Sequence, residues 1–108
     1  VDLTPDDPVW MGGYASRKKP SEGVAQRVHA KALALEGAGG RPLVIVTLDL
    51  VSIPRYLRAD IAQRVQAVHG LPPDALLFNA SHTHAGPELR IAQERTPYAM
   101  PPPCRSCA

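Results

Sequence analysis

The chain lacks any apolar run long enough to suggest a membrane-spanning helix. None of its segments reaches the roughly 18 consecutive apolar residues that such a helix needs, so we expect no transmembrane segment. The formal net charge is only +2, and the basic cluster at residues 17–19 favours a solvated turn. With no basic stripe elsewhere, we expect no nucleic-acid partner.

Cysteine is also scarce. The two cysteines, Cys104 and Cys107, form a Cys-x-x-Cys pair among prolines. One such pair is only half of a zinc knuckle, and a redox pair would normally open a helix after a strand. We therefore expect residues 91–108 to be a Pro-rich, disordered tail with incidental cysteines. Cysteine usage does not indicate a compartment.

The length and composition allow one small folded unit. With 108 residues, 44% of them hydrophobic, the chain is a small domain or a piece of a larger one, and we expect residues 1–90 to fold. It begins at Val1 and has no charged-then-apolar leader, so we expect a processed or excerpted sequence.

Three segments predict strands. Residues 43–49 are β-branched and almost wholly apolar, as in a strand buried on both faces, and residues 75–80 resemble them. Residues 23–36 are ambiguous, because alanines favour a helix while basic and apolar residues alternate from Arg27 onward. We predict a strand there, joined to the next by a glycine-rich hairpin connection at residues 37–42.

A helix is predicted between the second and third of these strands. Ser52 and Pro54 signal its start and Gly70 its end. Its apolar residues recur at spacings of four, four and three and are Leu57, Ile61, Val65 and Val68. His69 in the last turn is interpreted as structural. Strand, helix and strand with short links predict a βαβ unit with a parallel strand pair, and hence an α/β fold.

This topology has a consequence for function. Ligands of open α/β sheets bind beyond the carboxyl ends of the strands, and Asp49 and His82 both lie at such ends. The two residues should therefore share one rim of the sheet. An alternative for Asp49 is a cap of the turn that follows it.

The densest group of chemically active residues follows the last strand. His82 and His84 are two residues apart, so on an extended backbone their side chains would point to the same face, with Cα atoms about 6.5–7 Å apart. Two such imidazoles can meet one metal, or one can bind metal while the other faces the substrate. Solvated or core histidines are the alternative.

The residues around the two histidines resemble a known family. Residues 81–87, SHTHAGP, are similar to the SHTHSGP-type signature of the neutral (non-lysosomal) ceramidases, in their N-terminal catalytic domain. Three weaker elements agree in order: MGGYA at 11–15, RVHAKA at 27–32 and VTLDL at 46–50. His29 and Lys31 depart from the family's R-x-R-A pattern. The resemblance covers roughly residues 2–90 and implies the N-terminal fragment of a ceramidase-like domain.

The resemblance implies a zinc-dependent hydrolase that cleaves the N-acyl amide bond of a ceramide-like lipid. His82 would be a zinc ligand, and His84 would contact the substrate or the developing oxyanion. Asp49 is a candidate acceptor for a hydrogen bond from the His82 ring, which would orient that ring. Gly13 and Tyr14 would help to wall the substrate site. Zinc would lower the pKa of its bound water to about 7 and polarise the amide carbonyl.

The implied ligand set is incomplete in this chain. The family takes its other ligands, a His, a Glu and a Tyr, from later in a far longer chain, so we expect the present chain to be inactive alone. The resemblance suggests a secreted or membrane-associated protein, but the localisation of this chain stays open. A small α/β binding module with structural histidines is the alternative function. Metallo-β-lactamases and amidohydrolase barrels fit less well, because the residues after the motif and its place in the chain differ.

Overall fold

The computed structural model describes residues 1–90. The predicted tail and both cysteines lie outside the described residues. The elements, in chain order, are strand β1 (Ala30–Glu36), strand β2 (Pro42–Leu48), helix α1 (Arg55–His69), the short 3-10 helix η1 (Pro73–Ala75) and strand β3 (Leu76–Ala80). Among the described residues, no helix is both long and apolar enough to cross a membrane.

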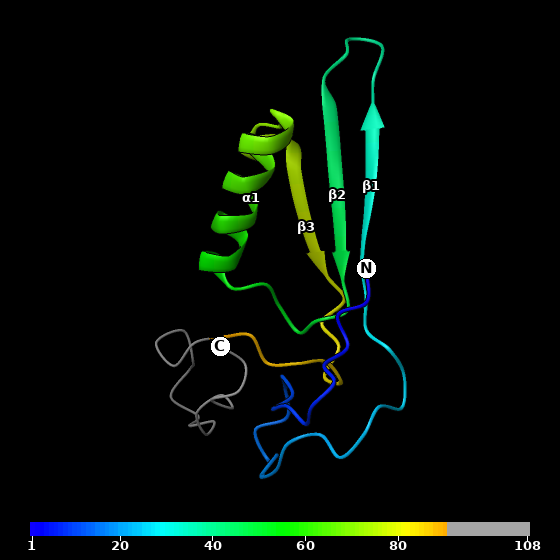
Figure 1. Cartoon of the computed structure of the whole chain (residues 1–108), viewed down its shortest axis with the longest axis vertical. Helices are drawn as coiled ribbons and strands as arrows, with labels where there is room; N and C mark the ends of the chain where they lie inside the picture. Colours follow the sequence, from blue (N-terminus) through cyan, green and yellow to red (C-terminus); the bar gives the residue numbers. More distant parts are fainter. Residues whose placement is uncertain (91–108) are drawn as a thin grey trace.

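The strands form one mixed sheet in the order β1-β2-β3 (Figure 1). β1 pairs with β2 in antiparallel fashion, and β2 pairs with β3 in parallel, from Val44↔Leu76 to Leu48↔Ala80. The helix connects the parallel pair, because a chain that leaves one end of a sheet must cross back to start a parallel strand. The predicted βαβ unit and the α/β fold class are confirmed.

β1 is shorter than predicted. It begins at Ala30, whereas the alternating pattern suggested a strand over residues 23–36. The pairing register explains the difference, since Ala30 already faces Leu48, the last residue of β2. Upstream of Ala30 β2 offers no further partner. The chain there bonds to the N-terminal segment instead, through the isolated bridge between Asp2 and His29 and the bond from Leu3 N to Val28 O.

Helix α1 starts and ends where the sequence indicates. Pro54 precedes its first residue, and Gly70 closes it in a left-handed conformation with φ of 67°, its N–H donating to Gln66 O. Ile61 and Val65 pack against the core, as predicted. Val68 is 74% exposed, so its predicted place on the packed face is wrong.

One face of the sheet is covered and the other is open. Under α1 lies a small core around Leu71, Ala75 and Leu76, onto which side chains of β2 and β3 pack. Residues that pair across neighbouring strands lie on the same face of the sheet. On the face away from α1, the apolar side chains keep much of their surface exposed. This open face consists of Leu33, Leu35, Leu43, Ile45 and Leu77. β2 is therefore covered on one side only, and the prediction that both of its faces are buried is wrong for the described residues.

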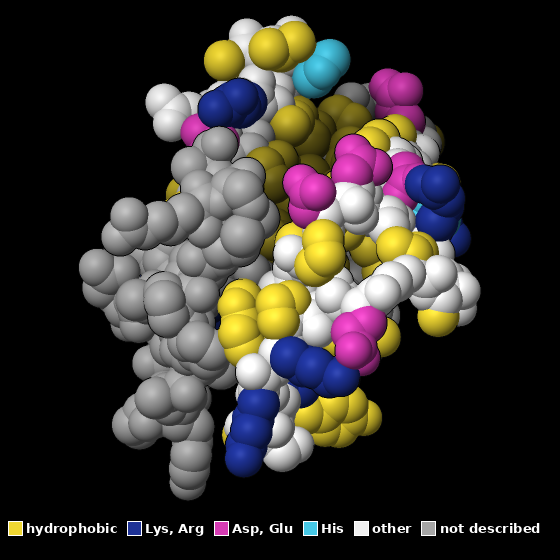
Figure 2. Space-filling view, turned by 60° about the horizontal axis from the view of Figure 1, so that its bottom comes forward, with side chains coloured by type: hydrophobic (Ala, Val, Ile, Leu, Met, Phe, Trp, Pro, Cys, Tyr) yellow, Lys and Arg dark blue, Asp and Glu magenta, His cyan; other side chains and the backbone are white. Residues whose placement is uncertain are grey.

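The carboxyl ends of β2 and β3 meet at the lower end of the sheet in Figure 1, where the N-terminal segment and residues 81–90 also lie. A bridge between Met11 and Pro87 joins these two segments, and the flanking bonds are Gly12 N to Gly86 O (3.0 Å) and Glu88 N to Trp10 O (2.8 Å). Figure 2, in which this end comes forward, shows hydrophobic, acidic and basic side chains intermixed on that face. Asp49 and His82 share this rim, as predicted.

Candidate functional site

His82 lies two residues beyond the end of β3 and has a left-handed backbone. Ser81 N still donates to Leu48 O (2.9 Å), but the φ of His82 is 59°. The prediction of an extended backbone across the two histidines is therefore wrong. The imidazoles nevertheless lie together, with ring centroids of His82 and His84 5.1 Å apart and ring planes at 61°. Strand alternation therefore does not explain why the two rings meet.

The His82 ring is oriented by a backbone carbonyl. Its Nδ1 lies 2.8 Å from Val51 O, in the segment that leaves β2. A carbonyl oxygen can only accept, so Nδ1 carries the proton in this bond and Nε2 presents its lone pair. Metal-ligating histidines are typically held in this way. The acceptor is Val51 O, and the prediction that Asp49 orients His82 is wrong.

His84 is held by packing against the Gly12–Tyr14 turn. Its ring centroid lies 4.6 Å from that of Tyr14, with the planes at 83°. Gly13 has a positive φ of 75°, and a Cβ there would lie 2.3 Å from His84 Cγ. Only glycine allows this approach without displacement. The structure thus brings together Gly13, Tyr14, His82 and His84, whose roles in substrate and metal binding stay predictions.

Asp49 serves the junction between β1 and β2. Its Oδ2 accepts from His29 N (2.9 Å), and its own N–H donates to His29 O (3.0 Å). The His29 Nδ1 lies 4.0 Å from the same carboxylate oxygen, and the Asp49 side chain is 45% exposed. The Asp49 carboxylate therefore bonds to His29, in the segment that precedes β1. A catalytic role for Asp49 stays a prediction.

Sequence reasoning missed an ion pair beside the motif, in which the carboxylate side chain is buried. The Glu88 side chain is 1% exposed and receives the Arg90 guanidinium through both carboxylate oxygens. The bonds to Glu88 raise the pKa of Arg90 above its usual value. Glu88 N also bonds to Trp10 O, so the pair secures the chain that leaves the motif against the N-terminal segment. An acidic and a basic residue two apart give no sequence signal that distinguishes them from surface charges.

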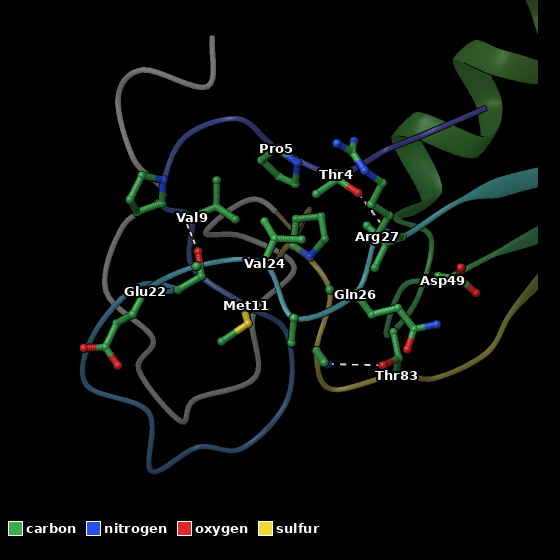
Figure 3. Close-up of a pocket in the computed structure, with 18 of the residues that line it drawn as sticks. Thr4, Pro5, Val9, Met11, Glu22, Val24, Gln26, Arg27, Asp49 and Thr83 are labelled. Carbon is green, nitrogen blue, oxygen red and sulfur yellow. Dashed lines mark hydrogen bonds between the residues drawn. The ribbon is translucent and has the colours of Figure 1, made fainter.

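A pocket of about 840 Å³ opens beside the motif (Figure 3). Met11, Val24 and Thr83 line it from three separate segments, and Asp49 lies at its edge. The motif contributes five residues to the wall, whereas His82 and His84 are not among the lining residues; the five are Ser81, Thr83, Ala85, Gly86 and Pro87. Size alone would favour this pocket as the site, but the sequence predicts the metal and substrate contacts at the two histidines, and we place the candidate site at their rings.

The donor set suits zinc only in part. An imidazole whose Nδ1–H is bound to a carbonyl, with Nε2 available, is a suitable zinc ligand. Within residues 1–90, however, no group of three or more His, Cys, Asp or Glu side chains could hold a metal ion. His82 fits a zinc site whose further ligands come from elsewhere.

Comparisons with known proteins agree with this fold and this motif. The family model described as "Neutral/alkaline non-lysosomal ceramidase, N-terminal" matches residues 3–94. The neutral ceramidases of Drosophila pseudoobscura pseudoobscura and Drosophila melanogaster are each 30% identical over 77 residues, which is 69% of this chain. A solved structure, a ceramidase complexed with C2, superposes on 75% of the chain with a TM-score of 0.68 and 33% identity.

The fold and the motif thus define the N-terminal portion of a ceramidase-type α/β domain. The chain belongs to the neutral/alkaline non-lysosomal ceramidase family, as the sequence resemblance predicts. It spans 11% of the length of the curated relatives and 13% of the solved ceramidase.

Proposed function

We propose that this chain contributes one zinc ligand and one substrate contact to an enzyme that hydrolyses the N-acyl amide bond of ceramide. The reaction consumes one water and releases a fatty acid and a sphingoid base. Family membership supports ceramide as the substrate class. The observation that carries the metal assignment is the bond between His82 Nδ1 and Val51 O, which directs the ring and leaves Nε2 as a donor to metal.

The residues of this chain would divide the work. His82 holds zinc, which when bound supplies an acidified water and polarises the amide carbonyl. His84, with its ring 5.1 Å from that of His82, contacts the substrate amide and stabilises the developing negative charge on its oxygen. Tyr14 is 61% exposed beside His84, so its ring is accessible to a ligand and can wall the site together with Gly13.

Residues other than those described must supply the remaining zinc ligands. Catalytic zinc sites use three protein ligands and an open position, and the described residues supply one oriented imidazole. We therefore propose that the present chain does not hydrolyse ceramide alone.

The first test is metal binding by the 108-residue chain. Titration with zinc, followed by NMR of the imidazole signals, should shift the signals of His82, and His82→Ala should abolish the effect. His69→Ala is the matched control, because His69 lies in the last turn of α1, at the opposite end of the sheet from the motif (Figure 1). A Cys104→Ala/Cys107→Ala double variant tests whether any bound zinc sits in the tail instead.

The second test is catalysis in a longer chain that includes residues 1–90. There His82→Ala should abolish zinc-dependent release of fatty acid from ceramide, while His69→Ala should keep it. Near-normal turnover of the His82 variant would refute the assignment. If zinc leaves the His82 NMR signals unchanged and the His82→Ala enzyme retains its activity, the alternative of structural histidines would be favoured.

A further inference from the structure

We propose that Arg17 is a positioning residue for His84: it clamps the Gly12–Tyr14 turn and, through the Tyr14 ring, keeps the His84 imidazole beside His82. The inference rests on the proposed function insofar as it gives His84 a substrate contact. The geometric claim itself can be tested without zinc or substrate.

Arg17 differs from the other members of its basic cluster. The sequence suggests that residues 17–19 form one solvated turn, and Lys18 and Lys19 are indeed exposed. Arg17 is half-buried, and it makes contacts directed back toward the motif. It therefore acts within the turn rather than as a solvated charge.

The first contact fixes the start of the turn. Arg17 Nη1 donates to Gly12 O at 2.6 Å, and Gly12 N donates to Gly86 O at 3.0 Å. The Gly12 backbone is thus bound on one side to the histidine motif and on the other to the guanidinium. A charge-assisted bond to a carbonyl is stronger than a neutral one, particularly where solvent is partly excluded.

The second contact fixes the aromatic ring. The Arg17 guanidinium carbon lies 5.0 Å from the Tyr14 ring centroid, within the range of a cation–π interaction. Arg17 N also donates to Tyr14 O at 3.0 Å, which closes the next turn, over residues 14–17. Tyr14 has φ of 43°, a conformation that a non-glycine residue adopts only when its surroundings hold it there. Arg17 supplies both of these restraints.

His84 depends on this turn more than His82 does. The His82 ring has its own hydrogen bond to Val51 O. Within residues 1–90, the structure shows no hydrogen bond to the His84 ring, which instead meets Gly13 and the rings of Tyr14 and His82. Its orientation is consequently set by packing, and a turn released from Arg17 would release His84 as well.

The test is NMR of the 108-residue chain with labelled histidine and tyrosine rings. In the parent chain we expect cross-relaxation between the Tyr14 and His84 ring protons and ring-current shifts on both. Arg17→Ala should remove the cross-relaxation and move the His84 signals toward those of a solvated histidine, while His82 and the sheet amides stay in place. Lys18→Ala, which removes a neighbouring exposed charge, should change none of these signals.

Arg17→Lys is the second variant, since a lysine keeps the positive charge but loses the planar fork. It should retain more of the Tyr14–His84 contact than Arg17→Ala does. Unchanged His84 and Tyr14 signals in Arg17→Ala would overturn the proposal. Loss of the sheet amide signals in both variants would also overturn it, because Arg17 would then hold the whole fold rather than the turn. Zinc-dependent shifts of His82 report separately on the proposed function.

Discussion

Gly13 lies against the His84 imidazole at a distance that leaves no room for a side chain: an added Cβ would be 2.3 Å from Cγ and 2.6 Å from both Cδ2 and Nδ1. The residue before the tyrosine of the N-terminal loop therefore determines where the second histidine of the motif can lie. The two residues are far apart in sequence, and the rim of the sheet brings them together.

Replacing Gly13 by alanine tests this contact. The new methyl group must displace His84, and a positive φ adds strain, so we expect the free energy of unfolding to fall by roughly 1–3 kcal/mol. Urea unfolding measures the loss, and the imidazole NMR signals of His84 should move. Gly37→Ala is the control, because a Cβ at Gly37 meets no heavy atom within 4 Å. Equal stability of the two variants would show that His84 adapts without cost.

The helix offers a second comparison. Ile61 packs on the core, whereas Val68 is 74% exposed. We expect Ile61→Ala to lower the free energy of unfolding by about 1–3 kcal/mol, less than for a fully buried isoleucine, and Val68→Ala to change it by less than about 0.5 kcal/mol. Thermal or urea unfolding of the two variants measures both values. A larger loss at Val68 would mean that the helix is rotated relative to the sheet.

The N-terminal segment should loosen in strong acid. Bonds from Thr4 and from the Arg27 guanidinium hold the pKa of Asp2 well below its usual range. A lowered pKa in the folded chain means that the stabilisation is complete above the ordinary carboxyl pKa and is lost as the pH falls toward the lowered value. The protection factor of Leu3 N, which donates to Val28 O, should therefore fall below about pH 4 when hydrogen exchange is corrected for the intrinsic rate at each pH.

Asp2→Asn separates this effect from general acid unfolding. The amide keeps an oxygen for Thr4 N but loses the ion pair with Arg27. The protection factor of Leu3 N should then be lower at neutral pH and should change less on acidification. Asp7→Asn, at an exposed carboxylate in the same segment, is the control. An unaltered acid dependence in the Asp2 variant would contradict the assignment.

The open face of the sheet should bind hydrophobic dyes. Leu33 and Leu77, which flank Ile45 from the two neighbouring strands, are 55% and 52% exposed. Contiguous exposed apolar surface of this kind promotes association. We expect Leu77→Lys to reduce dye fluorescence and to slow aggregation of the chain. Thr47→Lys adds the same charge to the same face without removing apolar surface, so a similar effect of both variants would attribute the change to charge.

Much of the fold follows from local patterns. The apolar residues of β2 and β3, the proline before α1 and the glycine after it mark elements through interactions between near neighbours, and these elements form where predicted. The predictions for Val68 and for the upstream part of β1 were wrong for one reason. Burial and strand pairing depend on how far the neighbouring element extends, and a local sequence pattern does not encode that extent. The shared rim of Asp49 and His82 was predictable because the two strands of a βαβ unit are parallel, which places their carboxyl ends at one edge of the sheet.

The sequence by itself determined the family and the βαβ unit, and it predicted the pair of histidines as the chemical centre of the chain. Only the tertiary structure decided how that centre is assembled: Val51 O as the acceptor for His82, Gly13 and Tyr14 as the support for His84, and Asp49 as a partner of His29. The physical reason is range. Strand and helix patterns arise from contacts between residues close in sequence, whereas the orientation of each imidazole depends on backbone atoms that folding brings from distant segments, and these leave no mark in the residue types.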